Sequence, residues 1–147
     1  MSGILDAIRG QLKELRVIED LPAGLRSRVM MVFLTVSEDH ILRRGSTLFT
    51  EDEQSDEAGY VLLEGTITVL KQDGESVTCS GPELLGEMQM LNPRHTRTAT
   101  VIAASDVKVL KFNWSSFFQI AEDLFDPDEL DALREGLANL AWKHFTG

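Results

Sequence analysis

The sequence contains one cysteine, four prolines and no long apolar run. Because Cys79 has no partner within the chain, an internal disulfide framework is excluded and a reducing compartment is expected. No apolar stretch near the N-terminus is long enough for a signal peptide, and none elsewhere approaches a membrane span. With 147 residues, the expectation is one soluble, cytoplasmic domain spanning residues 1–147 and no membrane partner.

Basic residues are also scarce. The 14 lysines and arginines face 24 acidic residues, which gives a net charge of −10 and a pI near 4.7. A chain this acidic repels nucleic-acid backbones and anionic membranes, so any anionic ligand needs a local site. The last helical stretch, residues 126–145, has only Arg134 and Lys143 as fixed cations, too few for a DNA-recognition helix. We therefore expect no direct nucleic-acid binding.

The residues that usually carry catalysis are few and dispersed. A metal site of the cupin type needs clustered histidines and a carboxylate on adjoining strands. No two of the three histidines lie two residues apart, and no Ser–His or Cys–His signature is present. The sequence therefore predicts no metal site and no enzyme. The histidines are His40, His95 and His144.

The hydrophobic patterns occur in the order helices, strands, helices. Residues 1–36 carry apolar residues at helical spacing, and residues 114–147 do so again. Residues 37–113 hold short apolar runs broken by glycine, aspartate and serine. This order predicts a mainly β fold, an antiparallel β-roll of the jelly-roll or cupin-like kind, with N-terminal helices and C-terminal helices.

Local signals mark where these segments begin and turn. Pro22 suits the first turn of a second helix, and Asp126 followed by Pro127 suits the start of the last one. The pair Asp73-Gly74 indicates a hairpin between two strands. A second turn is expected at Ser105-Asp106, between two strand-like runs within residues 101–112.

Residues 84–101 hold the chemistry of a sugar-phosphate site. Gly86 permits a tight turn, and a short helix after it points unpaired N–H groups at an anion. Arg97 can add a charge-assisted fork for a phosphate. Glu87 can accept hydrogen bonds from sugar hydroxyls.

The pair Gly86-Glu87, followed by Arg-Thr-Ala-Thr-Val at residues 97–101, resembles the phosphate-binding cassette of cyclic nucleotide-binding domains. These are the β-roll modules of bacterial catabolite activators, protein kinase A regulatory subunits and cyclic nucleotide-gated channels. Upstream, Leu42–Gly45 and Tyr60–Gly65 are similar to strands of that roll. The resemblance covers roughly residues 20–125.

The resemblance implies a role for each cassette residue. Arg97 pairs with the exocyclic oxygens of the cyclic phosphate, and Glu87 bonds the ribose 2′-hydroxyl. Thr98 contacts the phosphate or the base edge, and Gly86 with the amides that follow it shapes the turn. The last helix closes over the base as a lid, which brings Leu137, Leu140 or Trp142 to the purine. The implied ligand-binding set is Gly86, Glu87, Met88, Gln89, Arg97, Thr98 and Ala99.

Two functions follow from these observations. The first is a stand-alone sensor that binds cAMP or cGMP without a cofactor and signals to a protein partner, or to a second copy in a homodimer, through its terminal helices. The second is a degenerate domain that binds no nucleotide and acts as a protein-interaction module. Gln89, where the family usually has a small residue, and the glycine-free loop at 51–57 favour degeneration. Glu87 and Arg97 favour the sensor.

Overall fold

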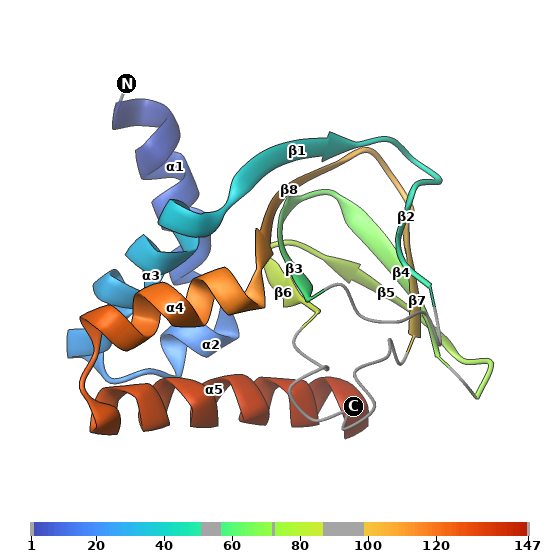
Figure 1. The fold of residues 1–147 in the computed structure, drawn as a ribbon. Coiled ribbons are helices and arrows are strands. Elements are labelled where there is room, and N and C mark those ends of the chain that lie inside the picture. Colours follow the sequence, from blue (N-terminus) through green and yellow to red (C-terminus); the bar gives the residue numbers. More distant parts are fainter. Residues whose placement is uncertain (1, 51–56, 72, 87–98, 147) are drawn as a thin grey trace.

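The computed structural model describes the backbone of residues 2–50, 57–71, 73–86 and 99–146, and the side chains of those residues between 7 and 140. Within these ranges the chain runs through helices, strands and helices again (Figure 1). The N-terminal helices are α1 (Ser2–Lys13), α2 (Arg16–Glu19) and α3 (Ala23–Val36). The C-terminal helices are α4 (Trp114–Leu124) and α5 (Pro127–Thr146).

The described strands form two antiparallel sheets of four strands each, which together make a β-roll. Sheet A has the order β1-β8-β3-β6, with β1 (Glu38–Leu42), β8 (Val107–Asn113), β3 (Ala58–Glu64) and β6 (Glu83–Leu85). Sheet B has the order β2-β7-β4-β5, with β2 (Thr47–Phe49), β7 (Ala99–Ala103), β4 (Thr66–Lys71) and β5 (Ser76–Ser80). The predicted fold class is confirmed.

Sheet A separates two apolar cores, because successive side chains of a strand point to opposite faces. On β3, Tyr60 and Leu62 point into the roll, whereas Val61 and Leu63 point toward the helices. The face that lines the roll is called the inner face of sheet A below, and the other is its outer face. The near-continuous apolar run of β3 is therefore explained by burial on both sides.

The helices pack against the outer face of sheet A and form the larger core (Figure 1). Phe33 of α3 contacts Phe112 of β8 edge-on, with ring centroids 5.4 Å apart, and lies 4.8 Å from Phe117 of α4. All three rings are buried, so aromatic contacts pack α3 and α4 against the outer face of sheet A. This layer explains the apolar stripes of the N- and C-terminal segments as ordinary packing.

The predicted turns are confirmed. Gly74 has a φ of +88° between β4 and β5, and the Glu75 N–H donates to Asp73 Oδ1 at 2.9 Å. At the β7–β8 turn, Asp106 Oδ1 accepts the Arg44 N–H at 2.9 Å and Oδ2 accepts Arg43 Nη1 at 3.2 Å. These bonds hold the pKa of Asp106 below its ordinary value, first through the Arg44 amide and then through the Arg43 side chain.

The short helix α2 is not predicted by the sequence, because one helical turn is too short to show a repeating hydrophobic pattern.

Up to Leu140, helix α5 packs against the helical layer, and Figure 1 shows its C-terminal end continuing below the roll. Leu137 and Leu140 are 1% and 3% exposed and belong to the core between the helices and the outer face of sheet A. Next to them, a Cβ on Gly136 would lie 3.7 Å from Leu21 and Val17 side-chain carbons. The expectation that Leu137 or Leu140 contacts a purine is therefore wrong for this arrangement, and the Trp142 side chain lies outside the described residues.

The start of α5 is held by a capping box and by Arg28 of α3. The Glu129 N–H donates to Asp126 Oδ1 at 2.9 Å, and the Asp126 N–H donates to Glu129 Oε1 at 3.1 Å. Arg28 donates to both oxygens of Glu129, with the Nη1–Oε1 contact at 3.3 Å, and lies 5.3 Å from the centroid of Phe125. The hydrogen bond from Arg28 and then that from the Asp126 amide lower the pKa of Glu129.

This contact predicts acid-dependent stability. A carboxyl whose pKa is lower in the folded state stabilises the fold above its unfolded pKa, and the contribution is lost as pH falls through the folded pKa. We therefore expect Glu129→Gln to lower the free energy of unfolding at neutral pH, and the deficit to shrink as pH falls below the ordinary value of 4.5. Urea unfolding of both proteins across that pH range measures it. A deficit that does not change with pH would mean that the charge of Glu129 contributes nothing.

Candidate functional site

Four strand ends meet at one end of the roll. The segment with the predicted ligand residues leaves sheet A at Gly86 and enters sheet B at Ala99. The connection from Phe49 to Ala58 crosses between the same sheets in the opposite direction. Phe49 is the register partner of Val101 in β7, and the carbonyl of Ala58 lies close to Gly86. The start of the 49–58 connection therefore lies beside the strand that follows the ligand segment, and its end lies beside the start of that segment.

Gly86 is enclosed by backbone and ring atoms at this point. Its φ is +94°, and a Cβ added there would lie 2.9 Å from Ala58 O, 3.1 Å from Phe49 Cζ and 3.2 Å from Gly59 Cα. The indole Nε1–H of Trp114 donates to Gly86 O at 3.3 Å. Only glycine fits both the left-handed conformation and the close approach. The left-handed conformation that suits a tight turn at Gly86 is therefore present, with Ala58 and Phe49 close beside it.

The structure describes two of the seven predicted site residues, Gly86 and Ala99. Ala99 is the first residue of β7, is half-buried and pairs with Lys71 at the end of β4. It lies at the same end of the roll as Gly86, so both boundaries of the cassette lie at that end. The other five lie outside the described residues, and their roles stay predictions: Glu87, Met88, Gln89, Arg97 and Thr98.

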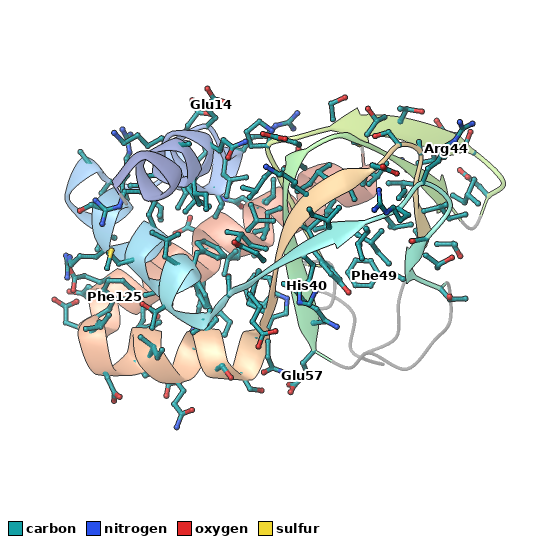
Figure 2. All side chains as sticks on the ribbon, turned by 90° about the horizontal axis from the view of Figure 1, so that it is seen from above. Glu14, His40, Arg44, Phe49, Glu57 and Phe125 are labelled. Carbon is teal, nitrogen blue, oxygen red and sulfur yellow. The ribbon has the colours of Figure 1, made fainter. Side chains whose placement is uncertain are left out.

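The floor of this end of the roll is apolar. Phe49 and Tyr60 meet edge-on with ring centroids 5.3 Å apart, and Figure 2 shows the Phe49 side chain between the roll's strands. The buried cluster behind them consists of Ala58, Leu62, Ile67, Leu85, Val101, Ala103, Val107 and Val109. Such an apolar surface can exclude water from one side of a bound base or sugar. The hydrogen bonds and charges that orient the ligand must then come from polar groups at the edge of this surface.

The basic residues Arg43 and Arg44 are not part of this site. They lie at the β1–β2 turn beside Asp106, at the opposite end of β7 from Ala99 (Figure 2). Arg43 is 82% exposed in its side chain, and its pairing with Asp106 fixes a turn. The stretch Leu42–Gly45, which resembles the family's first strands, therefore has a structural role here.

Cys79 is a half-buried residue of β5. Burial, and next the nearby carboxylate of Glu83, raise the pKa of its thiol. A thiol with a raised pKa carries little thiolate at neutral pH, which disfavours a nucleophilic role.

Across the residues that the structure describes, no three His, Cys, Asp or Glu side chains are grouped to hold a metal ion. In the same residues, no helix is long and apolar enough to span a bilayer.

The sequence analysis did not identify the two aromatic residues that fix Gly86. Trp114 lies 28 positions after Gly86 in the sequence, so no local pattern links them. Phe49 lies between the two upstream stretches that resemble the family, and its sequence neighbours give no sign that it contacts Gly86. One signal was available: Asn113 before the apolar Trp114 helix is an N-cap residue type, and its side chain does accept the Ser116 N–H.

Comparisons with known proteins agree with this geometry. The family model for the cyclic nucleotide-binding domain matches residues 40–123. A curated relative, the Pycsar effector protein PaPycTIR of Pseudomonas aeruginosa, is 35% identical over 81 residues, which is 55% of this chain. The chain spans 26% of that protein's length.

Solved structures share the fold at low sequence identity. The sensor domain of the transcriptional regulator DNR from Pseudomonas aeruginosa matches with a TM-score of 0.63 at 16% identity, over 94% of this chain and 90% of that chain. The catabolite activator protein of Thermus thermophilus matches with a TM-score of 0.65 at 19% identity, over 84% of this chain and 57% of that chain. The regulatory domain of Toxoplasma gondii PKA, crystallised with cAMP, matches with a TM-score of 0.63 at 18% identity, over 82% and 45%.

The family model covers more than half of the chain, from within β1 to near the end of α4, and includes both boundaries of the predicted phosphate-binding segment. The chain therefore belongs to the cyclic nucleotide-binding domain family.

Proposed function

We propose that this chain is a sensor that binds cAMP or cGMP and passes the signal to another protein through its terminal helices. The observation that carries the proposal is the family match over residues 40–123, which includes Glu87 and Arg97 in the spacing of the phosphate-binding cassette. The enclosed Gly86 supports it, because a fixed entry to that segment limits how its amides can point. Catalysis forms no part of this function.

The partner is proposed to be an effector protein or a second copy of the chain. The curated relative is named an effector, and one structural relative is the sensor part of a transcriptional regulator. Signalling requires that the nucleotide bind two arrangements of the helices with different affinity. The ion pair between Arg28 and Glu129 joins α3 to α5, so a movement of α5 relative to α3 would break it. We expect the protein to act in the cytoplasm.

Calorimetric titration tests the proposal. The wild-type chain is titrated with cAMP and cGMP, with cCMP and cUMP as pyrimidine arms, and with 5′-AMP as a control that lacks the cyclic ester. Saturable binding of cAMP or cGMP, and much weaker binding of 5′-AMP, is expected. If only a pyrimidine nucleotide binds, the sensor function stands and the purine assignment is wrong.

Absence of binding by all four cyclic nucleotides at about millimolar concentration, a free energy near −4 kcal/mol, would overturn the sensor function. The alternative is a domain that kept the roll and acts by protein contact alone. Gln89 favours it, because a long side chain stands where the family usually has a small one.

A further inference from the structure

Lys111 lies on the inner face of sheet A, among residues that are otherwise mostly apolar. In antiparallel sheets, directly opposed residues share a face. Lys111 is opposed by Tyr60 of β3, and Tyr60 is opposed in turn by Leu85 of β6. Tyr60 and Leu85 both belong to the cluster inside the roll, whereas Lys111 is exposed. The cation therefore stands at the edge of the apolar floor.

Contacts on this face connect Lys111 to the start of the phosphate-binding segment. Lys111 Nζ lies 5.8 Å from the centroid of the Tyr60 ring, and Tyr60 packs edge-on against Phe49. Phe49 Cζ would lie 3.1 Å from a Cβ on Gly86. Two aromatic rings thus separate the ammonium group from Gly86. Leu85, Tyr60 and Lys111 form one cross-strand row on β6, β3 and β8. Because Leu85 directly precedes Gly86, this row places Lys111 at the same end of the roll as Gly86.

From this geometry we propose that Lys111 is a second cationic contact for the nucleotide, alongside Arg97; the inference rests on the proposed function. A cyclic nucleotide carries one negative charge, and this chain carries −10, so a cation on the inner face offsets repulsion where the ligand enters. The cross-strand neighbour Glu38 has a carboxylate oxygen 3.5 Å from His40 Nε2, so its acid group is directed along β1. The ligand group that Lys111 would contact is the anionic phosphate, because an ammonium group is attracted to its charge.

Lys108 provides a matched control on the same strand. It is also exposed, but it lies on the outer face, three residues away, with Nζ 3.9 Å from Glu64. Replacing either lysine by glutamine changes the net charge equally. Of these two lysines, only Lys111 faces the inside of the roll. A direct contact with the ligand would therefore make only the Lys111 variant bind more weakly, whereas a long-range effect of charge would weaken binding equally in both.

The experiment measures the dissociation constant of the cyclic nucleotide that binds wild type best, for Lys111→Gln, Lys108→Gln and Lys111→Arg. We expect Lys111→Gln to weaken binding by roughly tenfold, the scale of a charged hydrogen bond, and Lys108→Gln by less than about twofold. Lys111→Arg should recover part of the affinity, because it keeps the charge. The loss in Lys111→Gln should persist between about 0.1 M and about 1 M salt, where the screening length falls from about 10 Å to 3 Å.

Three outcomes are distinguishable. If wild type binds and both glutamine variants bind alike, Lys111 makes no contact and the inference is overturned while the sensor function stands. If Lys111→Gln lowers only the melting temperature of the free protein, its role is to pack on Tyr60, and the inference is again overturned. If wild type binds no cyclic nucleotide, the proposed function and this inference fail together.

Discussion

Replacing Arg97 by alanine should raise the dissociation constant of the cyclic nucleotide about 10- to 150-fold. The expectation follows from the resemblance, which implies that the Arg97 guanidinium pairs with the exocyclic oxygens of the phosphate. Hydrogen bonds to charged groups contribute about 1.5–3 kcal/mol, which corresponds to that range. In a chain with a net charge of −10, few other cations can replace it. Calorimetry of wild type and variant at one salt concentration measures the effect.

Arg94 is the control for this prediction. It lies in the same segment, and its removal changes the net charge by the same amount. From the resemblance, Arg94 is expected at the exposed tip of the cassette. Arg94→Ala should therefore alter the dissociation constant by no more than about twofold, as expected for a screened surface charge. Equal losses in both variants would show that the segment attracts the ligand by charge alone, and the role assigned to Arg97 would be wrong.

Gly86→Ala should destabilise the fold strongly, because two separate costs apply at this position. A left-handed conformation costs an alanine about 1–2 kcal/mol, and overpacking typically adds about 1–3 kcal/mol. Both apply at Gly86, since its Cβ would lie 2.9 Å from the carbonyl oxygen of Ala58, a backbone atom that cannot rotate away. Chemical denaturation should therefore show a loss of roughly 2–5 kcal/mol in the free energy of unfolding.

Gly74 separates the two causes. Its φ of +88° is close to the +94° of Gly86, but a Cβ there meets nothing within 4 Å. Gly74→Ala should consequently cost only the conformational share, about 1–2 kcal/mol. Equal losses for the two variants would mean that Gly86 is needed only for its backbone angle, and that the approach of Ala58 and Phe49 relaxes at little cost.

Much of the fold could be predicted from local chemistry. The Asp73-Gly74 turn and the cap at Asp126 depend on neighbouring residues, and the structure confirms both. The helical stripes were likewise visible as periods. A stripe shows that a helix buries one face but does not name the partner, and this explains the error at Leu137, which packs into the helical core rather than over the roll.

The candidate site was predictable in type and only partly in detail. A glycine, a carboxylate and an arginine at that spacing indicate a phosphate site from chemistry alone, and the family match supports the assignment. The groups that fix Gly86, namely the Trp114 indole and the Phe49 ring, come from other strands and helices. Lys111 was missed for the same reason, because its face is set by register with β3 and not by its neighbours in sequence.

The strand order has a consequence for how the chain folds. Among the described strands, β4 and β5 are the only neighbours in a sheet that are also consecutive along the chain. Pairs such as β1 with β8 join segments about seventy positions apart, for instance Glu38 with Lys111. Loop-closure entropy opposes such pairs until much of the chain is ordered, so folding should be slow, in the range of milliseconds to seconds.

The two boundaries of the ligand segment lie on different sheets, Gly86 after β6 and Ala99 in β7. Neither sheet alone can bring them together, so the site forms late, after both sheets have assembled and closed. A ligand held between these two boundaries would therefore bind only the completed fold and would stabilise it against unfolding.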